Sequence, residues 1–294
     1  MRKIVILSLT ILLIIGTITG QTCPEPQSVL ADMQLANNYF MEKWPDPGVK
    51  IDPVHSSHIW TRNVYYNGLM ALYGISTNPD NRSKYYNYAV EWAESHDWGI
   101  RGGVNTTNAD NQCVGKTYID LYKIDSEPKR ISELKNNLQS MINSFRRDYW
   151  DWIDAIHMAM PVFAKMGKLQ KDTSYYEKVH AIYMFTKNQH GSNGLYNPED
   201  HLWWRDADFD PPYTEPNGED CYWSRGNGWV FSALAQVLNV IPKDASYRAE
   251  YKKTFKEMAQ ALKKVQREDG FWKVSLHDPD HYGGEETSGT ALFT

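Results

Sequence analysis

One aspartate in the middle of the chain has neighbours that suit proton transfer. Asp154 falls at the start of a predicted helix, because apolar residues recur at helical spacing over 153–164. Trp150 and Trp152 come just before it. A carboxyl group beside indole rings is a candidate for a raised pKa, since desolvation disfavours its charged form. The structural alternative is that Asp151 caps the helix and Asp154 only complements the helix dipole.

A second carboxylate opens another predicted helix. Asp110 lies in the polar run 108–111, directly before apolar residues at helical spacing. Together with Asp154 it would form an acid–base pair, although the sequence leaves the separation of the two carboxyl groups open. Asp110 also has a structural interpretation, because Asn and Asp are favoured helix caps.

The segment 222–229 combines an arginine with indoles and glycines. Trp223, Arg225 and Trp229 occur within it, and its two glycines permit close approach of the backbone. A guanidinium held between two indoles is suited to binding a planar carboxylate and stacking a ring. The alternative is that a helix start packs against a loop.

Further candidates have weaker signals. Trp204 and Arg205 would form a substrate lid, or else an aromatic plug with an Arg205–Asp206 pair. His157 follows Asp154 by nearly one turn, and a lone histidine of this kind is more often structural than catalytic. The residues His277 to His281 include two aspartates and suggest a metal, yet Asp-Pro-Asp is typical of a turn, which we favour.

No other pattern predicts a metal or cofactor. The three cysteines, Cys23, Cys113 and Cys221, form neither a disulfide framework nor a paired zinc motif. A phosphate-binding loop, a dinucleotide fingerprint and a serine nucleophile elbow are all missing from the sequence. We therefore expect no metal and no cofactor.

Helices must position these residues, because almost no alternating strand pattern occurs. Ten helices are predicted, over residues 27–43, 61–75, 83–95, 109–122, 128–145, 153–167, 174–188, 226–241, 246–267 and from 286 onward. The residues 189–225 form one long connection, and an unstructured connection of that length is usually functional.

The even-numbered helices share a feature. Polar or aromatic residues stand at or near their starts: Trp60, Tyr65, Asp110, Asp154, Trp223, Arg225, Glu286 and Ser288. The odd-numbered helices are ordinary amphipathic pieces. This alternation predicts a toroid of helical hairpins whose inner helices present a pocket at one mouth.

Composition excludes some partners. The formal net charge is -5 with no basic block, so nothing predicts binding to nucleic acid. The oligomeric state is not predicted. Aromatic residues form 13% of the chain, including eleven Trp and nineteen Tyr, which suits stacking on sugar rings.

The first 22 residues resemble a secretory signal peptide, with Arg2 and Lys3 before an apolar run over 4–15 and small residues near Gly20. We expect a secreted or periplasmic protein with one domain over 23–294. A lipid anchor at Cys23 would be the one route to a membrane, and we do not favour it.

Five segments occur together in a recognisable order: 108–118, 152–161, 202–206, 222–229 and 286–291. They resemble glycoside hydrolase family 105, whose members are unsaturated rhamnogalacturonyl or glucuronyl hydrolases and which is related to family 88. The resemblance implies an all-α (α/α)6 barrel. Because ten helices are two short of twelve, we expect the domain to be C-terminally incomplete, cut near its tenth helix.

The resemblance also implies a reaction. Such enzymes remove a 4,5-unsaturated galacturonyl or glucuronyl residue from the non-reducing end of lyase products of polysaccharides such as pectin, by hydrating the double bond. Asp154 matches the general acid and base, and Asp110 the carboxylate that orients it. The expected substrate-binding residues are Tyr65, Trp60, His157, Trp204, Arg205, Trp223, Arg225, Trp229, Glu286 and Ser288.

Two other functions stay open. One is a non-catalytic glycan-binding protein that keeps the aromatic pocket in a degenerate or truncated barrel. The other is a sugar epimerase on the same toroid, which would rely on paired histidines.

Overall fold

The computed structural model describes residues 24–191 and 193–294, and the chain divides into two compact units, Met1–Lys43 and Trp44–Thr294. In the first unit the structure describes helix α1 (Pro26–Lys43). The predicted signal peptide and Cys23 lie outside the described residues, and the prediction of a single domain over 23–294 stays a prediction. Within the described residues, no helix has the length and apolar character needed to cross a membrane.

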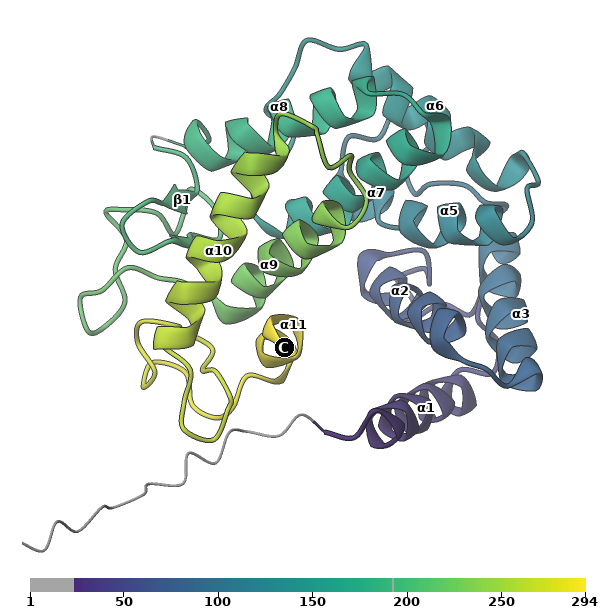
Figure 1. Ribbon diagram of the computed structural model, residues 1–294, viewed down its shortest axis with the longest axis horizontal. Helices are drawn as coiled ribbons and strands as arrows, with labels where there is room; N and C mark the ends of the chain where they lie inside the picture. The colour runs from purple at the N-terminus through teal and green to yellow at the C-terminus, as the bar shows by residue number, and fades with distance from the viewer. Residues whose placement is uncertain (1–23, 192) are drawn as a thin grey trace, which may run out of the picture. The chain divides into compact units, whose positions relative to one another are not determined.

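The second unit is built from helices and one short hairpin (Figure 1). Its elements are α2 (Trp60–Ile75), α3 (Pro79–Ser95), α4 (Ala109–Gln112), α5 (Gly115–Ile124), α6 (Lys129–Ile142), α7 (Asp154–Gln170), α8 (Ser174–Asn188), β1 (Tyr196–Asn197), β2 (Leu202–Trp203), α9 (Ser224–Leu238), α10 (Arg248–Lys264) and α11 (Thr287–Phe293).

Two predicted elements differ from the structure by more than the position of an end. The helix predicted from 109 onward is interrupted at Cys113 and Val114, which separate α4 from α5. The long connection 189–225 is not wholly irregular, because β1 and β2 pair antiparallel, Tyr196 with Trp203 and Asn197 with Leu202. Strands of two residues are too short to produce a visible alternation in the sequence.

Helices pair in sequence and then pack side by side. The neighbours α2 and α3, α5 and α6, α7 and α8, and α9 and α10 form hairpins. The first helix of each hairpin also contacts the next, in the order α2, α5, α7, α9 and finally α11. Figure 1 shows α3, α6, α8 and α10 outside this row. The predicted alternation of inner and outer helices is therefore confirmed for the second unit.

Local chemistry explains where α3 begins. Asn78 adopts an extended conformation, and its side-chain oxygen accepts hydrogen bonds from the backbone N–H groups of Asp80 and Asn81. Pro79 occupies the first turn, where its missing N–H costs nothing. The predicted start at 83 was one turn too late, because the cap and proline precede the periodic apolar residues.

The inner helix α7 contains a proline that its neighbour compensates. Pro161 has no N–H, so the carbonyl of His157, four residues earlier, loses its helical partner. The ammonium of Lys116 on α5 donates to that carbonyl at 3.1 Å. Lys116 is almost fully buried, and burial lowers its pKa. This bond joins α5 to α7 directly behind the start of α7.

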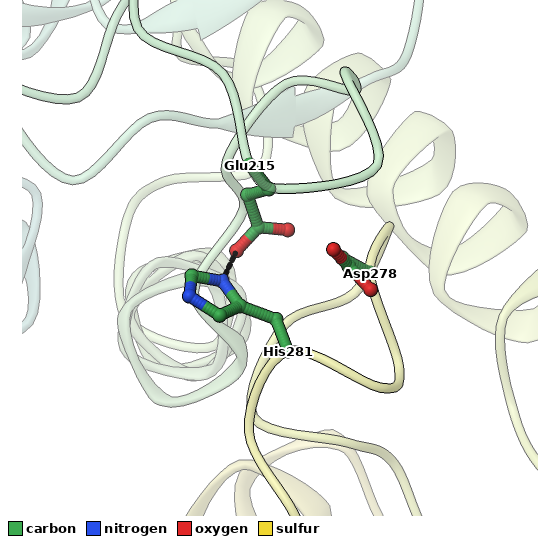
Figure 2. A group of neighbouring side chains, drawn as sticks. All are labelled: Glu215, Asp278 and His281. Atoms are coloured by element: carbon green, nitrogen blue, oxygen red, sulfur yellow. Dashed lines mark hydrogen bonds and ion pairs between the residues drawn. The ribbon is translucent and has the colours of Figure 1, made fainter.

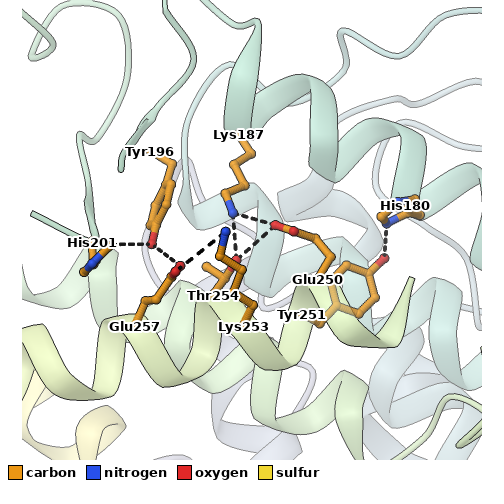
Figure 3. A network of polar contacts seen from close by, with 9 residues as sticks. All are labelled: His180, Lys187, Tyr196, His201, Glu250, Tyr251, Lys253, Thr254 and Glu257. Carbon is orange, nitrogen blue, oxygen red and sulfur yellow. Dashed lines mark hydrogen bonds and ion pairs between the residues drawn. The ribbon is translucent and has the colours of Figure 1, made fainter. Parts of the chain in front are cut away.

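A polar network holds the outer helices α8 and α10 to the β1–β2 hairpin (Figure 3). The buried Lys187 on α8 donates to Glu250 at 2.5 Å and to Thr254 at 2.8 Å, both on α10. Tyr196 of β1 donates to Glu257 at 2.9 Å. Burial acts to raise the pKa of Glu250, but the hydrogen bond and charge of Lys187 outweigh it and hold that pKa below its ordinary value. The network anchors the base of the hairpin.

Candidate active site

Asp154 is the first residue of α7, and it does not serve as a helix cap. Ile153 occupies the N-cap position without a side-chain hydrogen bond, and Asp151 is exposed rather than bonded to the helix. The capping alternative for Asp151 is therefore wrong. Trp150 is fully buried just before the turn, and its carbonyl accepts a hydrogen bond from Thr186 at 3.0 Å. This anchor fixes where α7 starts.

A cavity of about 600 Å³ opens in front of Asp154. It is lined by residues from the turn before α7 and its first residue, the segment just after α8, the segment after β2 and the N-cap of α9: Asp151, Trp152, Asp154, His190, Arg205, Asp206, Ala207, Asp208 and Trp223. Indole, guanidinium and carboxylate groups thus share one space of a size that suits a small ligand.

The carboxyl group of Asp154 is poised to hold a proton near neutral pH. Its Oδ1 is buried and has no hydrogen-bond partner among the residues the structure describes. Burial raises the pKa of Asp154 to about 7, and the negative charge of Asp110 adds to the rise. The positive charge of Arg225 opposes it. A carboxyl group with this pKa can both donate and accept a proton at pH 7.

Asp110 is the second carboxyl group of the site. Asn108 caps α4 by accepting from the backbone N–H of Asp110 at 2.8 Å, so the Asp110 carboxyl is not itself the cap. Burial raises the pKa of Asp110 to about 6, against the lowering effect of Arg101. Asp110 borders a second hollow of about 370 Å³, which Trp60 and Arg101 also line. Because α4 packs on α7, the Asp110 charge reaches Asp154.

The segment after β2 is fixed against both inner helices. Asn227 on α9 accepts from the N–H of Trp203 at 2.9 Å and donates to its carbonyl at 3.0 Å. The N–H of Ile153 donates to the carbonyl of Arg205 at 2.9 Å, and Trp152 pairs with Asp206 as an isolated bridge. These backbone bonds place Arg205 at the cavity beside Asp154.

The side chains of Arg205 and Trp204 lie in different surroundings. Arg205 forms an ion pair with Asp206 at 2.6 Å and lies over the ring of Phe209 at 4.5 Å. Trp204 is buried and stacks on Tyr222 with ring centroids 6.0 Å apart. The structure therefore places Trp204 as the aromatic plug rather than at the cavity, while Arg205 lines the cavity.

The segment 222–229 is divided between site and core. The Arg225 guanidinium lies 4.2 Å above the ring of Trp223, and its buried Nε has no partner within the described part of the chain. Trp229, one turn later, instead packs against His157 at 4.5 Å and Trp60 at 6.3 Å between ring centroids. The expected guanidinium between two indoles is thus a guanidinium on one indole, because Trp229 points toward α7 and α2.

Arg225 also borders a hollow of about 340 Å³, with Arg205, Trp223 and Tyr282 among its lining residues. Since Arg205 and Trp223 line this hollow and the cavity in front of Asp154, the two spaces adjoin. Two guanidinium groups therefore stand where a negatively charged ligand beside Asp154 would be held.

Four further expected ligand contacts also lie apart from the cavity in front of Asp154. His157 is buried against Trp229, and burial holds its pKa well below its ordinary value, so it is a neutral core residue. Tyr65 packs in an aromatic cluster with Tyr66 at 5.1 Å. Glu286 caps α11 by accepting from the N–H of Gly289, and Ser288 donates to the same carboxylate. Their roles in substrate binding stay predictions.

Comparison with known proteins identifies the family. The family model for Glycosyl Hydrolase Family 88 matches residues 33–294. The chain belongs to glycosyl hydrolase family 88. The sequence resemblance indicates family 105, with family 88 as its relative. The prediction is therefore confirmed for the superfamily that contains families 88 and 105.

Curated relatives of this family 88 chain include two proteins named unsaturated 3S-rhamnoglycuronyl hydrolase. The one from Formosa agariphila is 29% identical over 80% of this chain and 65% of its own length, and the one from Alteromonas sp. is 34% identical over 81% and 60%. The chain thus spans less than two thirds of the length of either. A solved family 88 structure from Bacteroides vulgatus has a TM-score of 0.81 at 31% identity, covering 92% of this chain and 77% of that one. The fold is the predicted (α/α)6 type.

Some site residues of the family 88 chain were not predicted from the sequence. His190 and Asp208 line the cavity, Arg101 faces Asp110, and Asn227 positions the β2 segment. His190 and Asp208 lie in the long connection without a motif around them, and the side-chain direction of Arg101 depends on its loop. Asn227 lies within the segment 222–229, which the sequence had already singled out. The signal that could have found it was an amide side chain at the start of a predicted core helix.

Proposed function

We propose that this family 88 chain belongs to a hydrolase that removes a 4,5-unsaturated uronic acid from the non-reducing end of lyase-generated oligosaccharides. The observation that carries the proposal is the Asp154 carboxyl, buried at a cavity with a pKa of about 7 and flanked by Arg205 and Arg225. The relatives named unsaturated 3S-rhamnoglycuronyl hydrolase support the same substrate class.

The chemistry adds one water across the double bond. Protonated Asp154 gives its proton to C4 of the unsaturated ring, and positive charge develops at C5 beside the ring oxygen. The Asp154 carboxylate then takes a proton from the water that attacks C5, which restores its starting state. The hemiketal opens to a ketone, and the hemiacetal left at C1 releases the neighbouring sugar.

The other groups have supporting roles in this proposal. Arg225 and Arg205 bind the uronate carboxylate through charge-assisted hydrogen bonds. Trp223 offers an aromatic face to the planar part of the ring. Asp110, whose own pKa is raised to about 6, hydrogen-bonds sugar hydroxyls and keeps the pKa of Asp154 high. We also propose the finer assignment to family 105, which the five ordered segments support.

The aglycone is proposed to be a rhamnose-containing sugar, because two relatives are named for 3S-rhamnoglycuronyl substrates. A panel of unsaturated disaccharides that differ in the second sugar and in its sulfation tests this. The highest kcat/KM is expected for a uronyl–rhamnose disaccharide. Equal rates across sugars would contradict selection of the aglycone.

The activity itself is tested by the ultraviolet absorbance of the conjugated double bond. The wild-type protein is expected to abolish this absorbance, and Asp154→Asn to lower kcat by about 10²–10⁴-fold while still binding the sugar. Asp148→Asn is the matched control, because Asp148 is exposed and lies outside the cavity. Sugar binding without loss of absorbance in the wild type would favour the glycan-binding alternative, and an isomerised sugar as product would favour the epimerase.

We also propose that the protein acts outside the cytoplasm, on the basis of the signal-like residues 1–22. Sequencing the N-terminus of the exported protein tests this, with cleavage expected near Gly20.

A further inference from the structure

A cluster of metal-ligand side chains lies beside the hollow that Arg225 borders. Glu215, from the long connection after β2, faces Asp278 and His281, from the segment between α10 and α11 (Figure 2). One ligand atom from each residue lies within 4.8 Å of the other two. The three side chains converge on one space although about 60 residues separate their segments.

The two segments are joined independently of any ion. Ser275 donates to the Glu215 carboxylate and accepts from the N–H of Asp278 at 2.9 Å. Asn217 donates through its backbone N–H to Asp278 at 3.2 Å and through its side chain to the carbonyl of His277 at 2.9 Å. The donor atoms are therefore preorganised, which a ligand site needs.

The two buried carboxyl groups of the cluster favour a bound cation. The Glu215 side chain is fully buried, and Asp278 is 6% exposed. In the described part of the chain, the ion-pair partner found for these two carboxylates is His281, at 3.2 Å from Glu215. One imidazole thus faces two buried carboxyl groups, and buried charges in proteins are paired or coordinate metals. An added cation would remove this imbalance.

One pair of ligand atoms already has the spacing of ligands that share an ion. Ligands that bind a metal at about 2.1 Å lie roughly 3.0–3.4 Å apart when adjacent, and the 3.2 Å between His281 Nδ1 and Glu215 Oε1 falls in that range. Two carboxylates with one imidazole form a mixed oxygen–nitrogen set. Imidazole favours Zn²⁺ and its transition-metal neighbours, whereas Ca²⁺ and Mg²⁺ prefer oxygen alone.

We propose that Glu215, Asp278 and His281 bind one divalent transition-metal ion, of which Zn²⁺ is the best match, with water completing its coordination. The turn expected around Asp278 is also present, because the N–H of Asp280 donates to its other carboxylate oxygen at 3.3 Å. Turn and site are compatible, so the expectation of a turn without a metal is revised by this proposal.

The ion would stabilise the wall of the neighbouring hollow rather than take part in the reaction. Glu215 lines that hollow together with Arg205 and Arg225. Tying Glu215 to the 275–281 segment limits movement of the long connection that carries Arg205. Binding of a ligand to the folded state alone raises thermal stability.

Metal binding by tag-free protein, stripped with a chelator, tests the proposal without reference to activity. Calorimetry with Zn²⁺ is expected to give one site per chain, and Zn²⁺ to raise Tm. Asp278→Asn and His281→Gln should each weaken Zn²⁺ binding at least about tenfold. Asp280→Asn is the matched control, because Asp280 lies on the same turn but is exposed; its affinity should equal that of the wild type.

The metal-free Tm of each variant is recorded alongside, so that a folding defect is seen separately from a lost ligand. The proposal is overturned if the wild type binds no stoichiometric Zn²⁺, or if Asp278→Asn and His281→Gln bind Zn²⁺ as tightly as Asp280→Asn does. Mn²⁺ and Ca²⁺ serve as comparison ions, and tighter binding of Ca²⁺ than of Zn²⁺ would contradict the assigned class.

Discussion

At the scale of single residues, two opposing effects set the pKa of Asp154. Its burial raises the pKa to about 7, whereas Arg225 lowers it. Burial has the larger effect, because the carboxyl loses water and gains no hydrogen bond at Oδ1 within the described structure. The same arginine that would bind the substrate therefore also adjusts the acid that would protonate it.

This balance predicts the pH dependence. Asp154 must be protonated to deliver its proton, so kcat/KM should fall as pH rises through about 7. Arg225→Gln removes a charge that lowers the pKa, and should move this fall to higher pH. Asp110→Asn removes a charge that raises it, and should move the fall to lower pH. Rate profiles of the three proteins measure both shifts.

Arg225→Gln should also raise KM by roughly 10–100-fold, since a hydrogen bond to a charged group contributes about 1.5–3 kcal/mol. Identical pH profiles in all three proteins would show that Asp154 is not the titrating group.

At the scale of elements, the start of α7 is held from two sides. The β2 segment is bonded to Ile153 and to Asn227, and Lys116 bonds the carbonyl that Pro161 leaves free. Both contacts connect inner helices at the end where Asp154 lies. The position of the carboxyl therefore depends on residues that never touch a substrate.

Asn227→Ala should destabilise the protein by about 1–3 kcal/mol, because the N–H and carbonyl of buried Trp203 lose their partner. kcat should fall as well, since Arg205 and Asp206 lie only two and three residues beyond Trp203. Gln236→Ala on the same helix is the control, where the loss is a hydrogen bond to Ser232 at 3.1 Å. Chemical denaturation gives both free energies of unfolding; equal effects would show that Asn227 has no special positioning role.

Because Lys116 bonds the carbonyl that Pro161 leaves free, the effects of substitutions at these two residues on the free energy of unfolding should be coupled. Lys116→Met should destabilise the protein while Pro161 is present, because the His157 carbonyl is left unsatisfied. With Pro161→Ala the helix regains an N–H for that carbonyl, and Lys116→Met should then cost less, with a coupling of about 0.5–3 kcal/mol. A double-mutant cycle of unfolding free energies measures this. Additive effects would mean that Lys116 does not compensate for the proline.

At the scale of the whole molecule, the sequence predicted the helices well and the pockets partly. The helix over 174–188 matches α8 and the inner–outer alternation matches the hairpins, because an apolar period reports which face is buried. Side-chain directions in loops depend on contacts across the fold. Hence Trp204 lies in the core and Glu286 caps a helix, and Arg101 and His190 were missed.

The arrangement of charge also belongs to the whole molecule. The chain has a formal net charge of -5, yet Arg205 and Arg225 border the space beside Asp154, and Arg101 borders the hollow beside Asp110. The guanidinium groups of Arg205 and Arg225, rather than the net charge, would attract an anionic uronate. The proposed reaction would thus begin with binding of the uronate carboxylate and proceed by protonation of the ring.

One measurement tests that central claim most directly. The loss of double-bond absorbance and the release of the second sugar are followed on the same sample of an unsaturated uronyl disaccharide. Hydration by Asp154 predicts that absorbance is lost no later than the sugar is released, and that neither occurs at a comparable rate in Asp154→Asn. Release of the sugar ahead of the loss of absorbance would mean displacement at the anomeric carbon and would contradict the account.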